Sequence, residues 1–217
     1  MITQKIKTRS TVFTYAPSKA WDLHLHLIEA QHRNYVIDTG LGSGSVQPIL
    51  QLLEADDKPT VVINTHHHWD HLWGNCCFAD CVIVAHRRCY ELLNEHWDVM
   101  IEENSAMADG LVERVLPNVL FEDMLYFADD RIRVFYTPGH TEDGISVLDE
   151  VDGVLNAGDS IGDTPDEIVP WLDCSRQVYR DTLLRFGAYD FDVCISGHNV
   201  IQGGDIMQRI LAKLDQE

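Results

Sequence analysis

The sequence predicts a layered α/β fold formed by a single domain over residues 1–217. Two observations predict it. The chain has 217 residues, of which 45% are hydrophobic, and this is enough apolar material for one globular core. Short apolar segments that end abruptly in polar residues recur along the chain, with helical segments between them. That alternation is typical of sheets covered by helices.

The first elements form a predicted hairpin followed by a helix. Residues 21–29 alternate, with leucines on one face and His24 and His26 on the other, as in a half-buried antiparallel strand. We therefore expect the two histidines to be structural or to face solvent. Residues 35–40 form the hairpin partner. Apolar side chains at helical spacing then predict an amphipathic helix packed on a sheet, namely Val46, Ile49, Leu50 and Leu53.

Four later strands each lead into a histidine or aspartate at a turn of small or polar residues. The predicted strands and the side chains that follow them are residues 60–64 before His66, residues 131–136 before His140, residues 153–157 before Asp159, and residues 191–196 before His198. In layered α/β folds, ligands bind in the crevice beyond the carboxyl ends of the strands. We expect these four turns to converge there.

The segment His66-His67-His68-Trp69-Asp70-His71 is the most informative motif of the chain. The pattern H-x-H-x-D-H places four potential metal ligands in one short loop. Imidazole and carboxylate groups are ordinary ligands of Zn²⁺ and Fe, whereas an uncoordinated cluster would be pushed apart by protonation near the usual histidine pKa of about 6.5. The motif predicts a metal site.

Charge and composition limit the partners of the chain. Sixteen lysines and arginines against thirty-five aspartates and glutamates give a net charge of −19, which disfavours nucleic acid as a partner. The N-terminal residues lack the apolar stretch of a signal peptide, and no run is long enough for a membrane helix. We expect a cytoplasmic protein with a small-molecule substrate and no membrane partner. Six cysteines without a C-x-x-C pair indicate reduced, mostly buried thiols.

Residues 20–200 resemble the metallo-β-lactamase superfamily, whose pattern is H-x-H-x-D-H followed by a lone histidine, a lone aspartate and a final histidine. The resemblance implies a four-layer αββα sandwich, with two sheets and helices on both outer faces. It also implies the role of each site residue: His66, His68 and His140 hold one metal, Asp70, His71 and His198 hold a second, Asp159 bridges the two, Asp38 orients a ligand histidine, and His67 points away.

The ligand set also predicts the chemistry. Two cations about 3.5–4 Å apart can share a water and lower its pKa towards about 7. We expect a binuclear hydrolase in which this metal-bridging hydroxide cleaves an ester, thioester or lactone bond of a small substrate, with Asp70 as the catalytic residue that orients it. Two divalent ions are expected; Zn²⁺ suits these ligands, and Fe or Mn binds the same set.

Several branches of the superfamily remain open. Nineteen residues follow His198, so a glyoxalase-II-like thioesterase would lack the extra C-terminal domain of that branch. The related lactonases carry a tyrosine shortly after the bridging aspartate, where this chain has Ser160, Ile161 and Gly162. A rival from another reaction class is a persulfide dioxygenase with one iron on His66, His140 and Asp159, a facial triad suited to O₂ chemistry.

The wall of the pocket is less clearly predicted. Residues 87–114 have helical character, and their apolar side chains either cover the metals as a lid or, as we favour, pack in the core; these are Tyr90, Trp97, Met100, Ile101 and Met107. Trp69 and Trp73 are expected at the rim. An anionic substrate would need Arg87, Arg88, Arg176 or Arg180, for which surface ion pairing is the simpler explanation.

Overall fold

Two β-sheets face each other at the centre of the computed structural model, which describes residues 1–17 and 21–216. The first sheet contains, in spatial order, β1 (Ile2–Ile6), β2 (Ser10–Tyr15), β3 (Leu23–Glu29), β4 (Asn34–Ile37), β5 (Thr60–Ile63), β6 (Val82–His86) and β7 (Val119–Phe121). The second contains β13 (Gln202–Gly203), β12 (Val193–Ile195), β11 (Val154–Asn156), β10 (Ile145–Asp149), β9 (Ile132–Tyr136) and β8 (Met124–Phe127).

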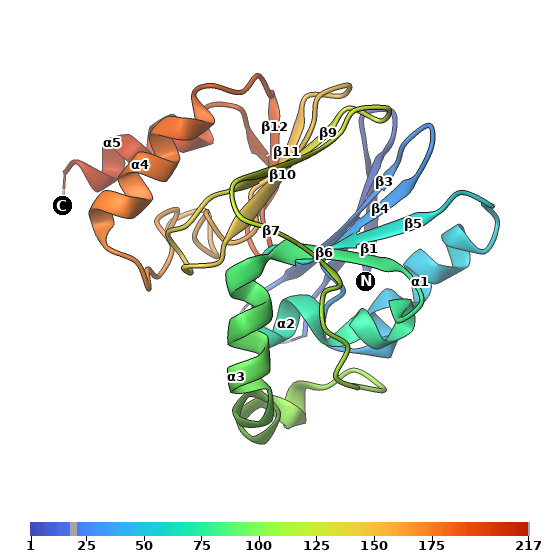
Figure 1. Cartoon of the computed structure of the whole chain (residues 1–217). Helices are drawn as coiled ribbons and strands as arrows, with labels where there is room; N and C mark the ends of the chain where they lie inside the picture. Colours follow the sequence, from blue (N-terminus) through green and yellow to red (C-terminus); the bar gives the residue numbers. More distant parts are fainter. Residues whose placement is uncertain (18–20, 217) are drawn as a thin grey trace.

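Helices cover the outer faces of both sheets (Figure 1). They are α1 (Ser43–Leu53), α2 (Trp69–Leu72), α3 (Arg87–Asn104), α4 (Arg176–Phe186) and α5 (Ile206–Leu214), with short 3₁₀ segments η1 (Trp73–Phe78) and η2 (Ser105–Met107). Figure 1 shows α4 and α5, in orange and red, outside the second sheet and α1, in cyan, outside the first. The four layers confirm the predicted αββα sandwich.

The central core fills the space between the two sheets. Ile37 and Ile63 of the first sheet pack in one cluster with Val134 and Val147 of the second, and all four side chains are fully buried. Complete burial of such a side chain contributes about 1.5–3 kcal/mol. This cluster holds the two sheets face to face and thereby fixes the relative positions of their strand ends.

Separate clusters attach the helices. On the first sheet, Val46 and Ile49 of α1 pack on Leu25 and Leu27 of β3. On the second sheet, α4 and α5 contribute the buried side chains Tyr179, Leu183, Ile206 and Ile210. The periodicity that predicted the first helix is therefore confirmed, and its apolar stripe faces the sheet.

Strand β3 differs from its prediction as a half-buried strand. Six of its seven residues are buried, and only Glu29 is exposed. The leucines face α1, while His24 and His26 are also buried, because the second sheet covers their face. His24 donates from Nδ1 to the carbonyl of Ser196 at 2.9 Å. The two histidines are structural, and the alternative that they face solvent is wrong.

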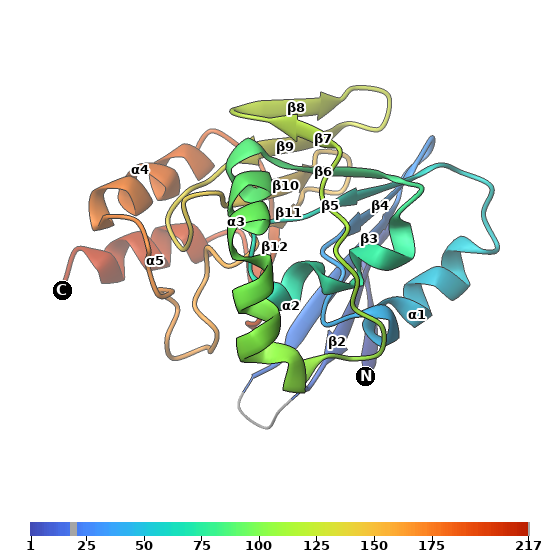
Figure 2. The ribbon, with the colours of Figure 1, turned by 60° about the horizontal axis from the view of Figure 1, so that its bottom comes forward.

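Parallel pairing brings the strand ends that precede the predicted site residues to the same edge of each sheet. β4 pairs with β5 in parallel, and β11 pairs with β12 in parallel. Figure 2, turned to bring the bottom of the molecule forward, shows α2 directly after β5, beside the end of the sheets, with α3 running past it. No helix in residues 1–17 or 21–216 is long and apolar enough to cross a membrane.

Candidate metal centre

Five strand ends supply the candidate site. β5 leads into the histidine loop at residues 66–71, β4 leads into Asp38, β9 into His140, β11 into Asp159 and β12 into His198. The expected convergence of these turns is confirmed by the short distances between their side chains. The local sequence explains the sharp turns, since Gly139, Gly158 and Gly197 each lie directly beside one of the polar residues.

The structure brings all seven predicted ligands together in two groups. His66, His68, His140 and Asp159 form one group, and Asp70, His71 and His198 form the other. Within each group the potential ligand atoms lie within 4.8 Å of one another. The assignment of each residue to a particular ion stays a prediction, but the spatial grouping matches the division inferred from the sequence.

Asp159 lies between the two groups. Its Oδ2 atom is 3.7 Å from Nε2 of His66 and 3.7 Å from Nε2 of His140, in its own group. The same oxygen is 3.3 Å from Nε2 of His71 and 3.2 Å from Nε2 of His198, in the other group. One carboxylate oxygen thus contacts both sets of imidazoles.

The spacing of the donor atoms fits bound cations. Nδ1 of His68 lies 3.2 Å from Nε2 of His140, and Nε2 of His198 lies 3.3 Å from Oδ2 of Asp70. Two nitrogen donors, each about 2.0–2.1 Å from one tetrahedral zinc, lie about 3.3 Å apart. These contacts therefore have the spacing of atoms that share an ion.

Two buried polar atoms at the site have no protein partner. Nε2 of His66 and Oδ1 of Asp159 are both inaccessible to solvent and make no hydrogen bond. An unsatisfied buried polar atom costs free energy, and a divalent cation in this position would satisfy the imidazole nitrogen. Together with the donor spacing, this shows that the residues present fit bound metal.

Asp38 fixes the orientation of two candidate ligand histidines, His71 directly and His66 through Thr65. Its Oδ2 accepts a hydrogen bond from Nδ1 of His71 at 2.8 Å, and its carboxylate also accepts from the backbone nitrogen and hydroxyl of Thr65, both at 2.7 Å. The Thr65 hydroxyl in turn lies 3.0 Å from Nδ1 of His66. Outer carboxylates of this kind direct the metal-facing nitrogen of a histidine, as the resemblance predicted for Asp38.

Backbone carbonyls hold two further histidines. Nδ1 of His140 donates to the carbonyl of Trp171 at 2.8 Å, and Nδ1 of His198 donates to the carbonyl of Asp22 at 2.7 Å. Both rings then present Nε2 to the site. Sequence reasoning missed these contacts, because a carbonyl oxygen is common to every residue type and leaves no signal in the sequence.

His67 points away from the candidate ligands, as expected. Its Nδ1 lies 2.9 Å from Oδ1 of the fully buried Asp143. This pair ties the histidine loop to the turn that follows His140. Nothing in the sequence singled out Asp143.

The pKa values of the candidate ligand histidines are shifted in opposite directions in the two groups. Burial and the neighbouring imidazoles lower the pKa of His66 well below its usual value, and burial lowers the pKa of His68 to about 4. Burial also opposes protonation of His71 and His198, but Asp159 and Asp70 outweigh it and raise the pKa of both. A bound cation can take the place of these protons, because the carboxylates of Asp70 and Asp159 attract a metal ion as they attract a protonated imidazole.

A pocket of about 290 Å³ opens onto the second group of ligands. Its lining residues are Trp21, His68, Trp69, Asp70, Asp163 and His198. The expected rim position of Trp69 is confirmed. Trp73 is wrong as a rim residue, because it is fully buried beneath α3 with Leu72 and Ala85.

Three of the five residues predicted as either lid or core pack in the core. Within α3, Trp97 and Met100 are buried in one cluster with Cys89 and Leu93, and Ile101 is partly buried against it. None of the five candidate lid residues lines the 290 Å³ pocket. Core packing, the favoured alternative, is therefore confirmed for Trp97, Met100 and Ile101, whereas Tyr90 and Met107 are only partly buried and belong to none of the described hydrophobic clusters.

The four arginines proposed for an anionic substrate lie elsewhere. Arg87 pairs with Glu122, Arg88 with Glu91 and Glu142, and Arg180 with Asp215, while Arg176 donates to the carbonyl of Leu214. None lines the pocket at the ligands. Surface pairing, the simpler explanation, accounts for the first three.

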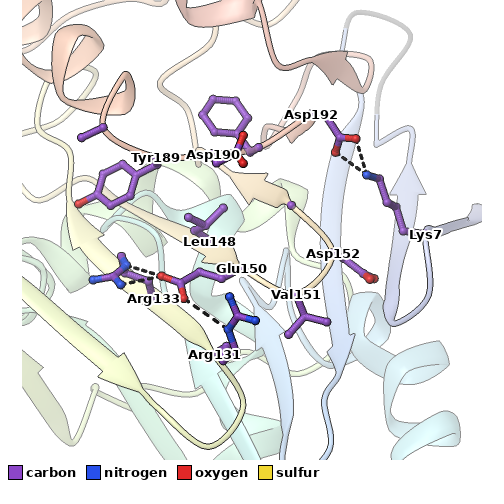
Figure 3. Close-up of a pocket in the computed structure, with 13 residues that line it drawn as sticks. Lys7, Arg131, Arg133, Leu148, Glu150, Val151, Asp152, Tyr189, Asp190 and Asp192 are labelled. Atoms are coloured by element: carbon purple, nitrogen blue, oxygen red, sulfur yellow. Dashed lines mark hydrogen bonds and ion pairs between the residues drawn. The ribbon is translucent and has the colours of Figure 1, made fainter.

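A larger cavity, of about 690 Å³, lies away from the candidate ligands, at the opposite ends of β9, β10, β11 and β12 (Figure 3). Its charged side chains pair with one another, with Arg131 and Arg133 on Glu150 and Lys7 on Asp192. None of the seven candidate ligands lines it. Cavity volume alone would therefore point to a place that holds none of the candidate ligands.

Comparisons with known proteins agree with this geometry. A curated hydroxyacylglutathione hydrolase from Thermosynechococcus vestitus is 24% identical over 147 residues, which are 63% of this chain and 52% of that protein. The alignment thus spans about half the length of that relative. The solved structure of VMB-1 has a TM-score of 0.78 at 16% identity and covers 99% of this chain and 96% of its own.

A second solved structure, the metallo-beta-lactamase from Pontibacter korlensis, has a TM-score of 0.77 at 19% identity and covers 100% of this chain and 99% of its own. At such identities the two solved structures show that the fold is shared. The sequence model of the metallo-beta-lactamase superfamily matches residues 25–198, a span that holds all seven candidate ligands. The chain belongs to the metallo-beta-lactamase superfamily.

Proposed function

We propose that the chain is a metal-dependent hydrolase that holds two divalent cations and cleaves an ester, thioester or lactone bond of a small substrate. The observation that carries this proposal is the position of Asp159, whose Oδ2 contacts histidines of both groups at 3.2–3.7 Å. A carboxylate oxygen in that position is suited to bridging two ions, and seven donors beside an open pocket differ from the closed four-ligand sets of structural zinc.

The cations, when bound, would lower the pKa of a water and polarise the substrate carbonyl. Residues of the chain would hold the attacking water in place. Asp70 lines the pocket and is ionised at neutral pH, since His71 and His198 lower its pKa despite burial. Its carboxylate can therefore accept a hydrogen bond from the attacking water and orient it. Water adds to the carbonyl carbon, the bond to the leaving oxygen or sulfur breaks, and the proton passes to the leaving group.

The similarity to a hydroxyacylglutathione hydrolase supports thioesters as one substrate class. The alternative of a mononuclear iron dioxygenase rests on His66, His140 and Asp159, which lie in one group. That reaction assigns no metal to Asp70, His71 and His198, although His71 and His198 lie 3.3 Å and 3.2 Å from one carboxylate oxygen of Asp159. Hydrolysis uses both groups.

The test is hydrolysis by protein stripped of metal and then reloaded. We expect chelator-treated protein to be inactive towards a panel of neutral esters, thioesters and lactones, and two equivalents of Zn²⁺, Mn²⁺ or Fe²⁺ to restore turnover of at least one class. Asp166→Asn is the control, since Asp166 lies outside the pocket lining and only its backbone carbonyl is engaged, by Lys213. Turnover that survives complete metal removal would contradict the proposal.

A further inference from the structure

Two tryptophans form the apolar wall of the pocket above the candidate ligands. The rings of Trp21 and Trp69 meet edge to face, with centroids 6.3 Å apart, and Trp21 also meets the ring of His198 at 5.2 Å. Both are only partly buried. Aromatic surface therefore remains available to a substrate at the mouth, directly beside a candidate ligand.

The same pocket contains an unpaired carboxylate. Asp163 lies four residues after Asp159, is exposed, and lines the pocket with the two tryptophans. Within residues 1–17 and 21–216 it makes no ion pair or hydrogen bond. Because it lines the pocket, this carboxylate is available to a ligand at the mouth.

Apart from the candidate metal ligands His68, Asp70 and His198, the described lining of this pocket carries one charged side chain, the carboxylate of Asp163, and neither lysine nor arginine. On the loop above His140, the 79% exposed Trp171 donates from Nε1 to Asp173 at 3.2 Å. A second pair of tryptophan and carboxylate thus lies on the loop whose carbonyl holds His140.

We propose that this pocket selects substrates whose non-reacting end carries a positive charge, of the alkylated ammonium class. A tryptophan face attracts a cation through its π electrons, and the free carboxylate of Asp163 completes the recognition. The net charge of −19 also steers cations towards the mouth and repels anions. The reaction performed on such a substrate rests on the proposed function, whereas the binding of the ammonium group does not.

The first test compares isosteric thioesters on the metal-loaded protein. Acetylthiocholine and S-(3,3-dimethylbutyl) thioacetate have the same shape and differ in one positive charge, and the S-acetyl derivative of 3-mercaptopropionate supplies an anion. We expect kcat/KM for the cation to exceed that for the neutral isostere by about 3- to 30-fold, with the anion slowest. Products are measured by chromatography, because the partly exposed free cysteines of the chain would react with a thiol reagent.

The variants assign that preference to named residues. Asp163→Asn should lower the ratio of cation to neutral turnover about threefold or more, and Trp21→Leu should lower it while Trp21→Phe retains most of it. Asp166→Asn removes the same charge from the same loop without touching the pocket, and should leave both rates unchanged. A ratio near one in the unmodified protein, or a ratio insensitive to Asp163, would overturn the inference.

A binding measurement separates this inference from the proposed function. We expect benzyltrimethylammonium to quench tryptophan fluorescence saturably, phenylacetate to bind more weakly, and Asp163→Asn to weaken the ammonium at least threefold. If none of the thioesters, esters and lactones is hydrolysed but the ammonium binds in this way, the proposed hydrolysis fails and the inference stands. If hydrolysis occurs but phenylacetate binds as tightly as the ammonium, the inference fails alone.

Discussion

Nδ1 of His71 donates a 2.8 Å hydrogen bond to Oδ2 of Asp38, and both residues are buried. Asp38 reaches this position with φ of +60°, in the left-handed region that residues other than glycine rarely adopt. Its carboxylate also holds the backbone and hydroxyl of Thr65. A strained residue that orients a histidine so that Nε2 faces the candidate metal pair is typical of a preorganised site.

Replacing Asp38 should weaken metal binding more than it weakens the fold. Asp38→Asn keeps the size of the side chain and tolerates the positive φ, but its amide cannot accept all three hydrogen bonds. We expect about 10- to 100-fold lower metal affinity, measured by competition with a chelator. Asp38→Ala should show the same loss and additional destabilisation of about 1–3 kcal/mol from the strained backbone. Unchanged metal affinity in Asp38→Asn would contradict the role assigned to this carboxylate.

Gly197 leaves room for the site. A Cβ atom at this position would lie 2.2 Å from Oδ1 of Asp159 and 2.6 Å from Cε1 of His71, which is closer than such atoms approach in folded proteins. Gly197→Ala should therefore displace one of the two side chains and abolish binding of at least one cation. Gly203→Ala is the matched control, since its Cβ would meet only the side chain of Asp205, at 3.1 Å. Metal content shows the difference directly, and equal content in both variants would argue against a site beneath Gly197.

Asp159 should matter for metal number rather than for folding. Asp159→Ala removes the one carboxylate oxygen that contacts both groups of histidines, so we expect loss of one metal and of most hydrolysis. The circular dichroism spectrum should stay unchanged, because the hydrophobic clusters between the sheets are untouched. A variant that retains two metals and full turnover would disprove the bridging assignment.

His26 should make the fold sensitive to acid. It is fully buried, neither ring nitrogen has a partner, and burial lowers its pKa to about 3. The unfolded chain binds this proton near pH 6.5, so stability is lost as pH falls from about 6.5 towards 3, by up to about 1.4 kcal/mol per pH unit. Urea denaturation in chelator should show a flatter pH dependence for His26→Leu than for the unmodified protein. The exposed His32 provides the control in His32→Leu, and an equal change in both variants would contradict this account.

The sequence alone predicted the sheets, the first helix and the positions of all seven candidate ligands. It could do so because H-x-H-x-D-H is local, and because His140, Asp159 and His198 each follow an apolar strand. Metal ligands belong to a few residue types, mainly histidine, cysteine, aspartate and glutamate. Candidate ligands are therefore easier to recognise in a sequence than the residues that support them.

The supporting contacts could not be predicted. Trp171 and Asp22 act through their carbonyls, and Asp143 meets His67 across 76 residues of chain. The burial of both faces of β3 was also missed. An alternating pattern shows only which side chains are polar, and His24 and His26 are polar side chains that lie inside the core. Only the second sheet, which is remote in sequence, determines that this face is covered.

The most direct test of the central claim is the number of metal ions per chain, measured by elemental analysis on protein purified without added metal, together with O₂ uptake on glutathione persulfide. The account predicts two ions per chain, hydrolysis that depends on both, and no O₂ uptake. One iron per chain with rapid O₂ uptake and no hydrolysis would contradict it, and would leave Asp70, His71 and His198 as a structural half of the site.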